Sequence, residues 1–169
     1  VSADPAQDVA QIALVERHRE TGQVTNAFVS GFGYKGRMAI GSTVAHDSHH
    51  MIVVGTDRER MAAAANRLQE IGGGITVWKD GSEIAQVPLP IAGLMSDSPA
   101  AEVAAKATHM VEAMAECGCT LNNAYMQHSL LALVVIFRFV SAGAVAPALL
   151  VLAVGAAGYA VRLHKRSKI

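Results

Sequence analysis

The sequence predicts an α/β protein of the α+β type, in which a mixed sheet has helices packed on it. Three observations support this class: apolar runs of strand length, two helical patterns with recognisable ends, and an Asp-Gly turn between two strand-like runs. Their order favours a sheet covered by helices on at least one side. Residues 1–136 form the predicted domain, and residues 137–169 form an atypical tail that contains a predicted C-terminal apolar helix.

Four extended segments are predicted before the first helix. Residues 10–15 alternate apolar side chains with small or polar ones, and residues 24–33 form a short extended piece. Residues 38–44 are predicted to be a strand. Residues 51–54 form a continuous apolar run, which favours a buried position in the sheet.

The first helix is predicted to begin at a capping box. Thr56 is the expected N-cap, because its hydroxyl can accept from the third helical amide while Glu59 reaches back to the Thr56 amide. The apolar residues at helical spacing are Met61, Ala64, Ala65, Leu68 and Ile71. Gly72 is suited to a left-handed cap, so the triple glycine 72–74 closes this helix and does not have the geometry of a phosphate-binding loop.

A hairpin and a second helix follow. Asp80-Gly81 separates residues 75–78 from residues 83–87, and this dipeptide fits a type I′ turn. Pro99 suits the first position of the next helix, and Gly118 suits its end. The face expected to be buried consists of Val103, Ala107, Met110, Val111 and Met114.

Composition argues against several classes of function. Lys and Arg number 14, as do Asp and Glu, so no net charge attracts the chain to nucleic acid, and nucleic-acid binding is not expected. Cys117 and Cys119 are one residue apart, which suits neither a zinc ribbon nor a redox pair, and we interpret them as reduced thiols. The serines lack the frame of a hydrolase nucleophile elbow.

The loop between the two central strands is the best candidate for a site. His46, Asp47, His49 and His50 lie within five positions between apolar strands, where binding and catalytic groups are often held. They could bind a divalent metal, but the spacing is not diagnostic of one. A substrate-facing role and ordinary hydrogen-bonded histidines remain the alternatives.

Several segments together resemble the C-terminal domain of bacterial adenine deaminases, in the amidohydrolase superfamily. They are ALVERHRETG (13–22), FVSGFG (28–33), AIGSTVAHDSHHMIVVGT (39–56), NRLQEIGGGITVWKDG (66–81), PLPIAGLMS (88–96) and ECGCTLNNAYMQHSLLAL (116–133). The resemblance covers residues 10–135. It implies hydrolytic deamination of adenine to hypoxanthine and ammonia, in the cytoplasm, as part of purine salvage or catabolism.

In that family the catalytic groups and the manganese or iron belong to an N-terminal barrel. The chain contains no His-x-His motif and no room for a barrel of about 250 residues. The resemblance therefore implies a C-terminal fragment with no catalytic residue, no metal ligand and no deaminase activity of its own. The expected partners are the N-terminal barrel of the same enzyme, adenine, and further copies in a homo-oligomer.

The family signature falls on His46, Asp47, Ser48 and His49. The resemblance implies that this loop faces the barrel and helps close the adenine pocket. His50 stands where such sequences more commonly carry asparagine. Further candidates for the substrate site or the domain interface are Gly31, Phe32, Gly33 and Met95.

The tail departs from the family. Residues 139–161 carry no charge, and about 20 apolar residues suffice to span a membrane. A frameshifted or fused ending would explain this segment. A membrane anchor is the other interpretation, and it leads to the alternative function of a membrane-tethered, non-enzymatic module that binds a small molecule or a partner.

Overall fold

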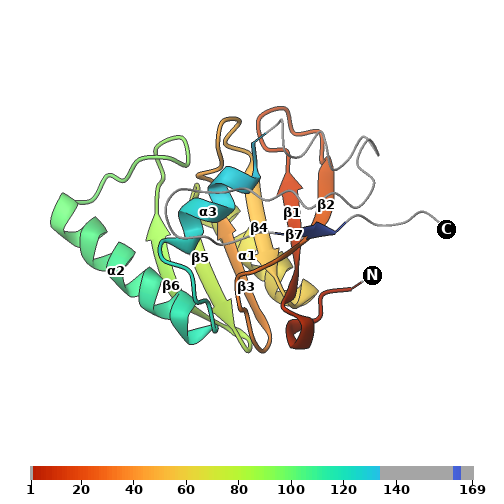
Figure 1. Ribbon diagram of the computed structural model, residues 1–169. Helices are drawn as coiled ribbons and strands as arrows, with labels where there is room; N and C mark the ends of the chain where they lie inside the picture. The colour runs from red at the N-terminus through yellow and green to blue at the C-terminus, as the bar shows by residue number, and fades with distance from the viewer. Residues whose placement is uncertain (1, 134–161, 165–169) are drawn as a thin grey trace.

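The computed structural model describes residues 2–133 and the backbone of Arg162–His164 (Figure 1). A short 3-10 helix, Pro5–Gln7, precedes the first strand. The strands and helices then follow in the order β1 (Val9–Val15), β2 (Val24–Ser30), β3 (Met38–Ser42), β4 (Met51–Gly55), α1 (Arg58–Glu70), β5 (Gly74–Lys79), β6 (Ser82–Pro88), α2 (Ala100–Glu116), α3 (Ala124–Leu131) and β7 (Arg162–His164).

The strands form one sheet in the order β6-β5-β3-β4-β1-β2-β7. The predicted α+β class, with helices packed on a sheet, is confirmed. The sheet was expected to be mixed, but each pair of neighbouring strands in the described residues is antiparallel. Short connections explain this for the consecutive pairs β1–β2, β3–β4 and β5–β6, because parallel neighbours need a long crossover.

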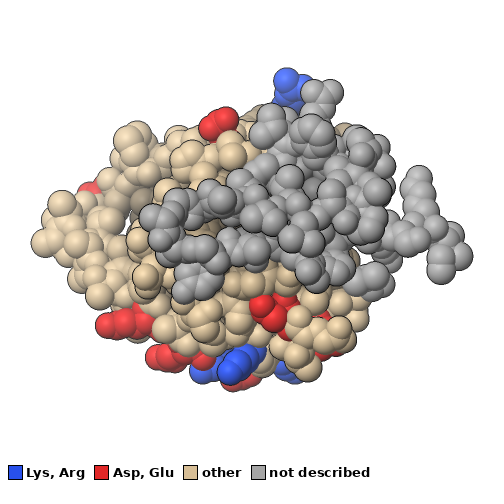
Figure 2. All heavy atoms as spheres, in the orientation of Figure 1, with Lys and Arg blue, Asp and Glu red and all other residues tan. Residues whose placement is uncertain are grey.

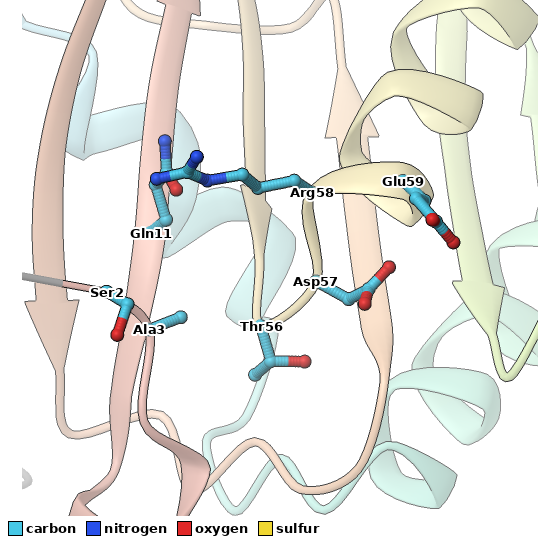
Figure 3. Close-up of a pocket in the computed structure, with 7 residues that line it drawn as sticks. All are labelled: Ser2, Ala3, Gln11, Thr56, Asp57, Arg58 and Glu59. Carbon is cyan, nitrogen blue, oxygen red and sulfur yellow. The ribbon is translucent and has the colours of Figure 1, made fainter.

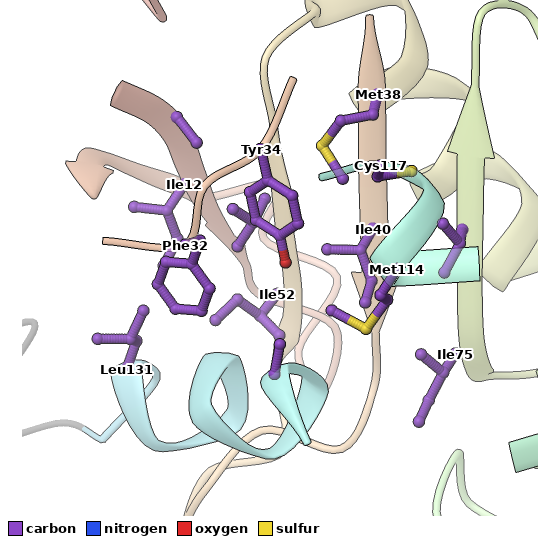
Figure 4. Packing of buried hydrophobic residues seen from close by; sticks show 14 of the residues in the cluster. Ile12, Phe32, Tyr34, Met38, Ile40, Ile52, Ile75, Met114, Cys117 and Leu131 are labelled. Atoms are coloured by element: carbon purple, nitrogen blue, oxygen red, sulfur yellow. The ribbon is translucent and has the colours of Figure 1, made fainter. Parts of the chain in front are cut away.

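Helices cover both faces of the sheet (Figure 1). α1 packs on one face against β3, β4 and β5, where Ala39 and Val53 face Ala64. α2 and α3 lie on the other face, over a larger core that includes Ile12 and Ile40. Figure 4 shows this larger core. Neighbouring residues of one strand thus belong to different cores, as the alternation of side chains in a strand requires.

The N-terminus of α1 differs from the prediction. The N-cap is Asp57, whose carboxylate accepts a hydrogen bond from the Arg60 amide at 3.1 Å. Thr56 instead bonds the start of β3: its hydroxyl donates to the Gly36 carbonyl at 2.6 Å and accepts from the Met38 amide at 3.0 Å. Both residues are good caps, and the tertiary contact of Thr56 with β3 decides between them.

The second helix begins one residue later than predicted, with Pro99 as its N-cap. Met110 and Met114 are buried as expected, but Val111 is 40% exposed. α2 packs mainly on the edge strand β6, so only a narrow stripe of the helix reaches the core. The third helix, α3, was not predicted; it has eight residues, and its apolar side chains show weak helical periodicity.

The predicted turns are confirmed. Asp80 and Gly81 join β5 to β6 with φ of 54° and 138°, as a type I′ turn requires positive φ at both central positions. Gly72 follows α1 with φ of 76°, which is the left-handed cap expected there.

The predicted C-terminal helix and the membrane interpretation concern residues outside the described part. Within the described residues, no helix combines the length and hydropathy of a membrane span. The backbone of β7 extends the sheet beyond β2, with Leu163 opposite Val29. On the face drawn in Figure 2, acidic and basic side chains are interspersed along the lower edge, in keeping with the balanced charge of the sequence.

Candidate functional site

Three connections leave the sheet at the same end. Val15, the last residue of β1, lies opposite Met51, the first residue of β4, and the β3 terminus Ser42 lies opposite Ile52. β6 also ends here, because Pro88 lies opposite Gly74. We call residues 16–23, 43–50 and 89–99 the loop end of the sheet; it is at the top of Figure 1.

The His46–His50 segment is held by its own backbone and by α3. His46 Nδ1 lies 2.5 Å from Ser129 Oγ, and the His46 amide donates to the Ser129 carbonyl at 3.1 Å. The His49 amide donates to the Ala45 carbonyl at 2.6 Å, and His49 Nδ1 accepts from the Ala45 amide at 3.4 Å. Asp47 is exposed, whereas the other residues of the loop are half-buried. The side chains of His46 and His49 therefore have hydrogen-bond partners, whereas the buried Nδ1 of His50 has none among the described residues.

Arg17 joins this loop to the next one. Its Nε donates to the His49 carbonyl at 2.7 Å, and its Nη2 donates to the Ala92 carbonyl at 2.8 Å. Burial lowers the pKa of Arg17, but guanidinium groups stay charged in proteins. His18 Nε2 donates to the Ser48 carbonyl at 2.6 Å, since a carbonyl oxygen only accepts. Two consecutive side chains of the β1–β2 connection thus hold the backbone of the histidine loop.

Glu16 fixes the shape of the same connection. Desolvation raises the pKa of its carboxyl, but hydrogen bonds from Thr21, Arg19 and His18 outweigh this effect and lower the pKa to about 2. His50 Nδ1 lies 4.0 Å from the carboxylate. Desolvation and the neighbouring His18 lower the pKa of His50, so its imidazole is neutral at neutral pH.

Thr43 attaches the third loop. Its hydroxyl donates to the Gly93 carbonyl at 2.6 Å and accepts from the Gly74 amide at 2.8 Å. Three apolar side chains of this loop are exposed and close together in sequence, and we call them the apolar trio: Ile91 (46% exposed), Leu94 (36%) and Met95 (57%). Met95 therefore lies at the same end of the sheet as the histidine loop.

The glycine-rich candidate segment lies elsewhere. Gly31, Phe32 and Gly33 follow β2, whose last residue pairs with Val9 at the opposite end of the sheet. The Asp8 carboxylate accepts from the Gly31 and Gly33 amides, each at 2.7 Å. The Phe32 ring is buried (Figure 4). The structure does not bring these three residues to the histidine loop, and their contacts are those of domain packing.

A hollow of about 300 Å³ also lies at that opposite end, beside the start of α1 (Figure 3). Its lining residues are Ser2, Ala3, Gln11, Thr56, Asp57, Arg58 and Glu59. The predicted site residues do not line it. The geometry of this hollow therefore adds nothing to the candidate site.

Comparison with known proteins identifies the family. Residues 1–143 match the family described as the adenine deaminase C-terminal domain. The chain belongs to this family. It is 82% identical over 135 residues to an adenine deaminase of Ruegeria pomeroyi and 46% identical over 133 residues to one of Clostridium botulinum. These alignments cover 80% and 79% of this chain, and the chain spans 22% of the length of each relative.

By the family resemblance, the manganese or iron is expected in the N-terminal barrel. Among the described residues of this chain, no group of three or more His, Cys, Asp or Glu side chains is placed to hold a metal ion. Nδ1 of His46 and Nδ1 of His49 already have hydrogen-bond partners within the chain. We assign no metal-dependent step to the described residues.

Three residues of the loop end, and one residue of α3, were not among the predicted site residues: Arg17, His18 and Thr43, and Ser129 of α3. Arg17 and His18 belong to the segment 13–22 of the family resemblance, but nothing in their spacing showed that they would reach the histidine loop. Ser129 is 83 residues from His46 in sequence. Only the fold brings these groups together.

Proposed function

We propose that this domain is the C-terminal part of an adenine deaminase, which converts adenine and water into hypoxanthine and ammonia. The support is the family membership and the adenine deaminase name of the relatives, of which the chain corresponds to 22%. In this proposal the metal-dependent catalytic barrel, with manganese or iron, is N-terminal to the domain. The enzyme acts in the cytoplasm in purine salvage or catabolism, as a homo-oligomer, and the domain alone is inactive.

The convergence of three loops at one end of the sheet is the observation that carries the role of the domain. Arg17 donates a hydrogen bond to each of two loops, the histidine loop and the loop of the apolar trio, and so joins them. Exposed apolar side chains that lie together are typical of contact surfaces. We propose that the loop end faces the barrel, with the apolar trio in the interface and His46 and His49 at the adenine pocket.

In this proposal, the domain contributes to the reaction by closing the adenine pocket. A closed pocket excludes bulk water and strengthens each polar contact with the substrate. Imidazole rings suit this task, because they can hydrogen-bond to a purine in a closed site, where an unpaired polar group is unfavourable. His46 and His49 are half-buried, and Nδ1 of each ring has a hydrogen-bond partner within the chain. The Nε2 atoms can therefore be held in a constant position toward the substrate.

The test is a chimera of the Ruegeria pomeroyi adenine deaminase in which residues 1–133 of this chain replace the C-terminal domain. We expect adenine deaminase activity, and we expect His46→Ala and His49→Ala each to lower kcat/KM by about tenfold, which corresponds to the loss of one hydrogen bond in a closed site. The control is His109→Ala, an exposed histidine of α2. A folded but inactive chimera would refute the function, and unchanged steady-state constants in both loop variants would refute the role of the loop.

The chain alone provides a second test. We expect no hypoxanthine from adenine when the purified chain is incubated with Mn²⁺ or Fe²⁺ and the products are separated by chromatography. The intact relative under the same conditions is the positive control. Metal-dependent turnover by this chain would contradict the assignment of the catalytic groups to the N-terminal part.

A further inference from the structure

The short helix α3 is placed to control one histidine of the loop. It packs against β3 and β4 on the face that also carries α2, and in Figure 1 it extends toward the loop end. Ser129 is fully buried in this helix, and its side chain points to His46: Oγ lies 2.5 Å from Nδ1 and 3.2 Å from the His46 amide nitrogen. The ring Nδ1 and the amide nitrogen of His46 therefore both lie within hydrogen-bond distance of the Ser129 hydroxyl.

The hydrogen-bonding capacity of a hydroxyl decides the direction of these bonds. A serine hydroxyl has one proton to donate and two lone pairs with which to accept. The His46 amide can only donate, so Ser129 Oγ accepts from it. In the described part of the chain, His46 Nδ1 is the one acceptor within reach of the Ser129 proton. A buried hydroxyl proton without an acceptor is unfavourable, so the proton points to Nδ1.

We infer that Ser129 is a positioning residue, which fixes the His46 ring with its proton on Nε2 and presents that N–H to the substrate. This inference rests on the proposed function. Nε2 makes no hydrogen bond within the described residues, and His46 is only half-buried. His46 therefore acts as a donor, and its partner in the closed site is an acceptor.

This direction limits which part of a purine His46 contacts. The unprotonated ring nitrogens of adenine accept hydrogen bonds, whereas its exocyclic amino group presents donors. An Nε2–H group fits a ring nitrogen and is mismatched to the amino group. It also cannot take a proton from water, because its nitrogen lone pair is part of the ring system. The role of His46 is thus orientation of the purine ring and not general base catalysis.

The helix itself is anchored by the residue before Ser129. His128 Nε2 lies 3.0 Å from the Tyr34 hydroxyl, and the His128 ring lies 4.5 Å from the Phe32 ring, centroid to centroid. Burial lowers the pKa of His128 to about 3, so it stays neutral and the core around α3 carries no charge at neutral pH. These contacts of His128 hold α3 against the core, one residue before Ser129.

Nuclear magnetic resonance on this chain tests the inference directly. Long-range ¹H–¹⁵N correlation spectra of the imidazoles at pH 7 distinguish a protonated from an unprotonated ring nitrogen. We expect Nδ1 of His46 to be pyridine-like and Nε2 to be pyrrole-like. The opposite pattern, or an average of the two forms, would overturn the inference, and this result does not depend on any deaminase activity.

Substitutions at Ser129 test whether its hydroxyl holds the His46 ring. We expect Ser129→Ala to move the Nδ1 resonance to the position of an unbonded nitrogen, and Ser129→Thr, which keeps the hydroxyl, to leave it in place. Ser82→Ala is the control, because Ser82 lies at the start of β6, at the end of the sheet opposite the histidine loop. An unmoved Nδ1 resonance in Ser129→Ala would show that the hydroxyl does not hold the ring.

The chimera gives the functional readout. We expect Ser129→Ala to lower kcat/KM by about three- to tenfold, the range for one lost hydrogen bond, and Ser129→Thr to restore it. Equal kcat/KM values for Ser129→Ala and the unsubstituted chimera would refute the positioning role. If the unsubstituted chimera is inactive, the proposed function fails, while the tautomer of His46 is still decided by the spectra.

Discussion

Replacing Thr43 by valine removes one hydroxyl from the loop end and changes little else. The two side chains have nearly the same shape, and Thr43 is 1% exposed. The hydroxyl accepts from the Gly74 amide at 2.8 Å and donates to the Gly93 carbonyl at 2.6 Å. The Gly74 carbonyl is also near the hydroxyl, but it already accepts from the Thr43 amide. Valine therefore leaves one buried amide and one buried carbonyl without these partners.

The expected loss of stability follows from these two groups. Each buried polar group left without a partner costs about 1–3 kcal/mol. The added methyl group offsets about 0.8 kcal/mol. We therefore expect Thr43→Val to lower the free energy of unfolding by about 2–4 kcal/mol and Tm by about 10 °C. The loss should also free the loop of the apolar trio, because Thr43 is its attachment to β3.

Urea unfolding measures this effect, and the single tryptophan, Trp78, gives the fluorescence signal. Thr43→Ser is the control: it keeps the hydroxyl and loses a methyl group, so we expect a cost of about 1 kcal/mol. A Thr43→Val protein within about 0.5 kcal/mol of the wild type, which is the range of a neutral surface substitution, would refute the reasoning. It would mean that water or a shifted backbone satisfies both groups.

Three further predictions concern other buried sites. Gly73→Ala should lower the free energy of unfolding by about 2 kcal/mol or more in urea titration, because a Cβ there would lie 2.5 Å from Gly93 Cα at φ of 113°; Gly22→Ala, with open space around it, should cost less. Since burial lowers the pKa of His128 to about 3, the unfolded chain binds a proton that the folded domain does not. The free energy of unfolding should therefore fall by about 1.4 kcal/mol per pH unit as the pH drops below 6.5. Urea titrations of His128→Gln at pH 6.5 and pH 5 should lack this decrease. Burial raises the pKa of Cys117 to about 11, so mass spectrometry should show no alkylation of this thiol at pH 8 until urea unfolds the domain.

The sequence was sufficient to predict those elements in which the local pattern of residues agrees with their burial. The hairpin followed from Asp80-Gly81, because a tight turn needs residues that tolerate positive φ. The core of α1 followed from helical spacing: Met61, Ala64 and Leu68 are buried. The same kind of reasoning was wrong for Val111, since periodicity cannot show how wide a stripe the neighbouring strand covers.

The candidate site was predictable only in part. The histidine loop was found because polar residues between two apolar strands stand out in the sequence. The groups that hold it were missed, because Arg17 reaches Ala92 across 75 positions and Ser129 reaches His46 across 83. Such contacts depend on strand order and on α3, and neither follows from local spacing.

A few hydrogen bonds between distant segments hold the loop end together. Arg17, Thr43 and Ser129 each join segments that are far apart in sequence, and each does so through hydrogen bonds to one or two loop groups. The sheet beneath is held by a continuous ladder and by cores on both faces, so it should unfold at higher free energy than the loops. Loss of one tie should therefore loosen the loop end first. In an intact enzyme, mild destabilisation at these three residues should raise KM before it lowers the amount of folded protein.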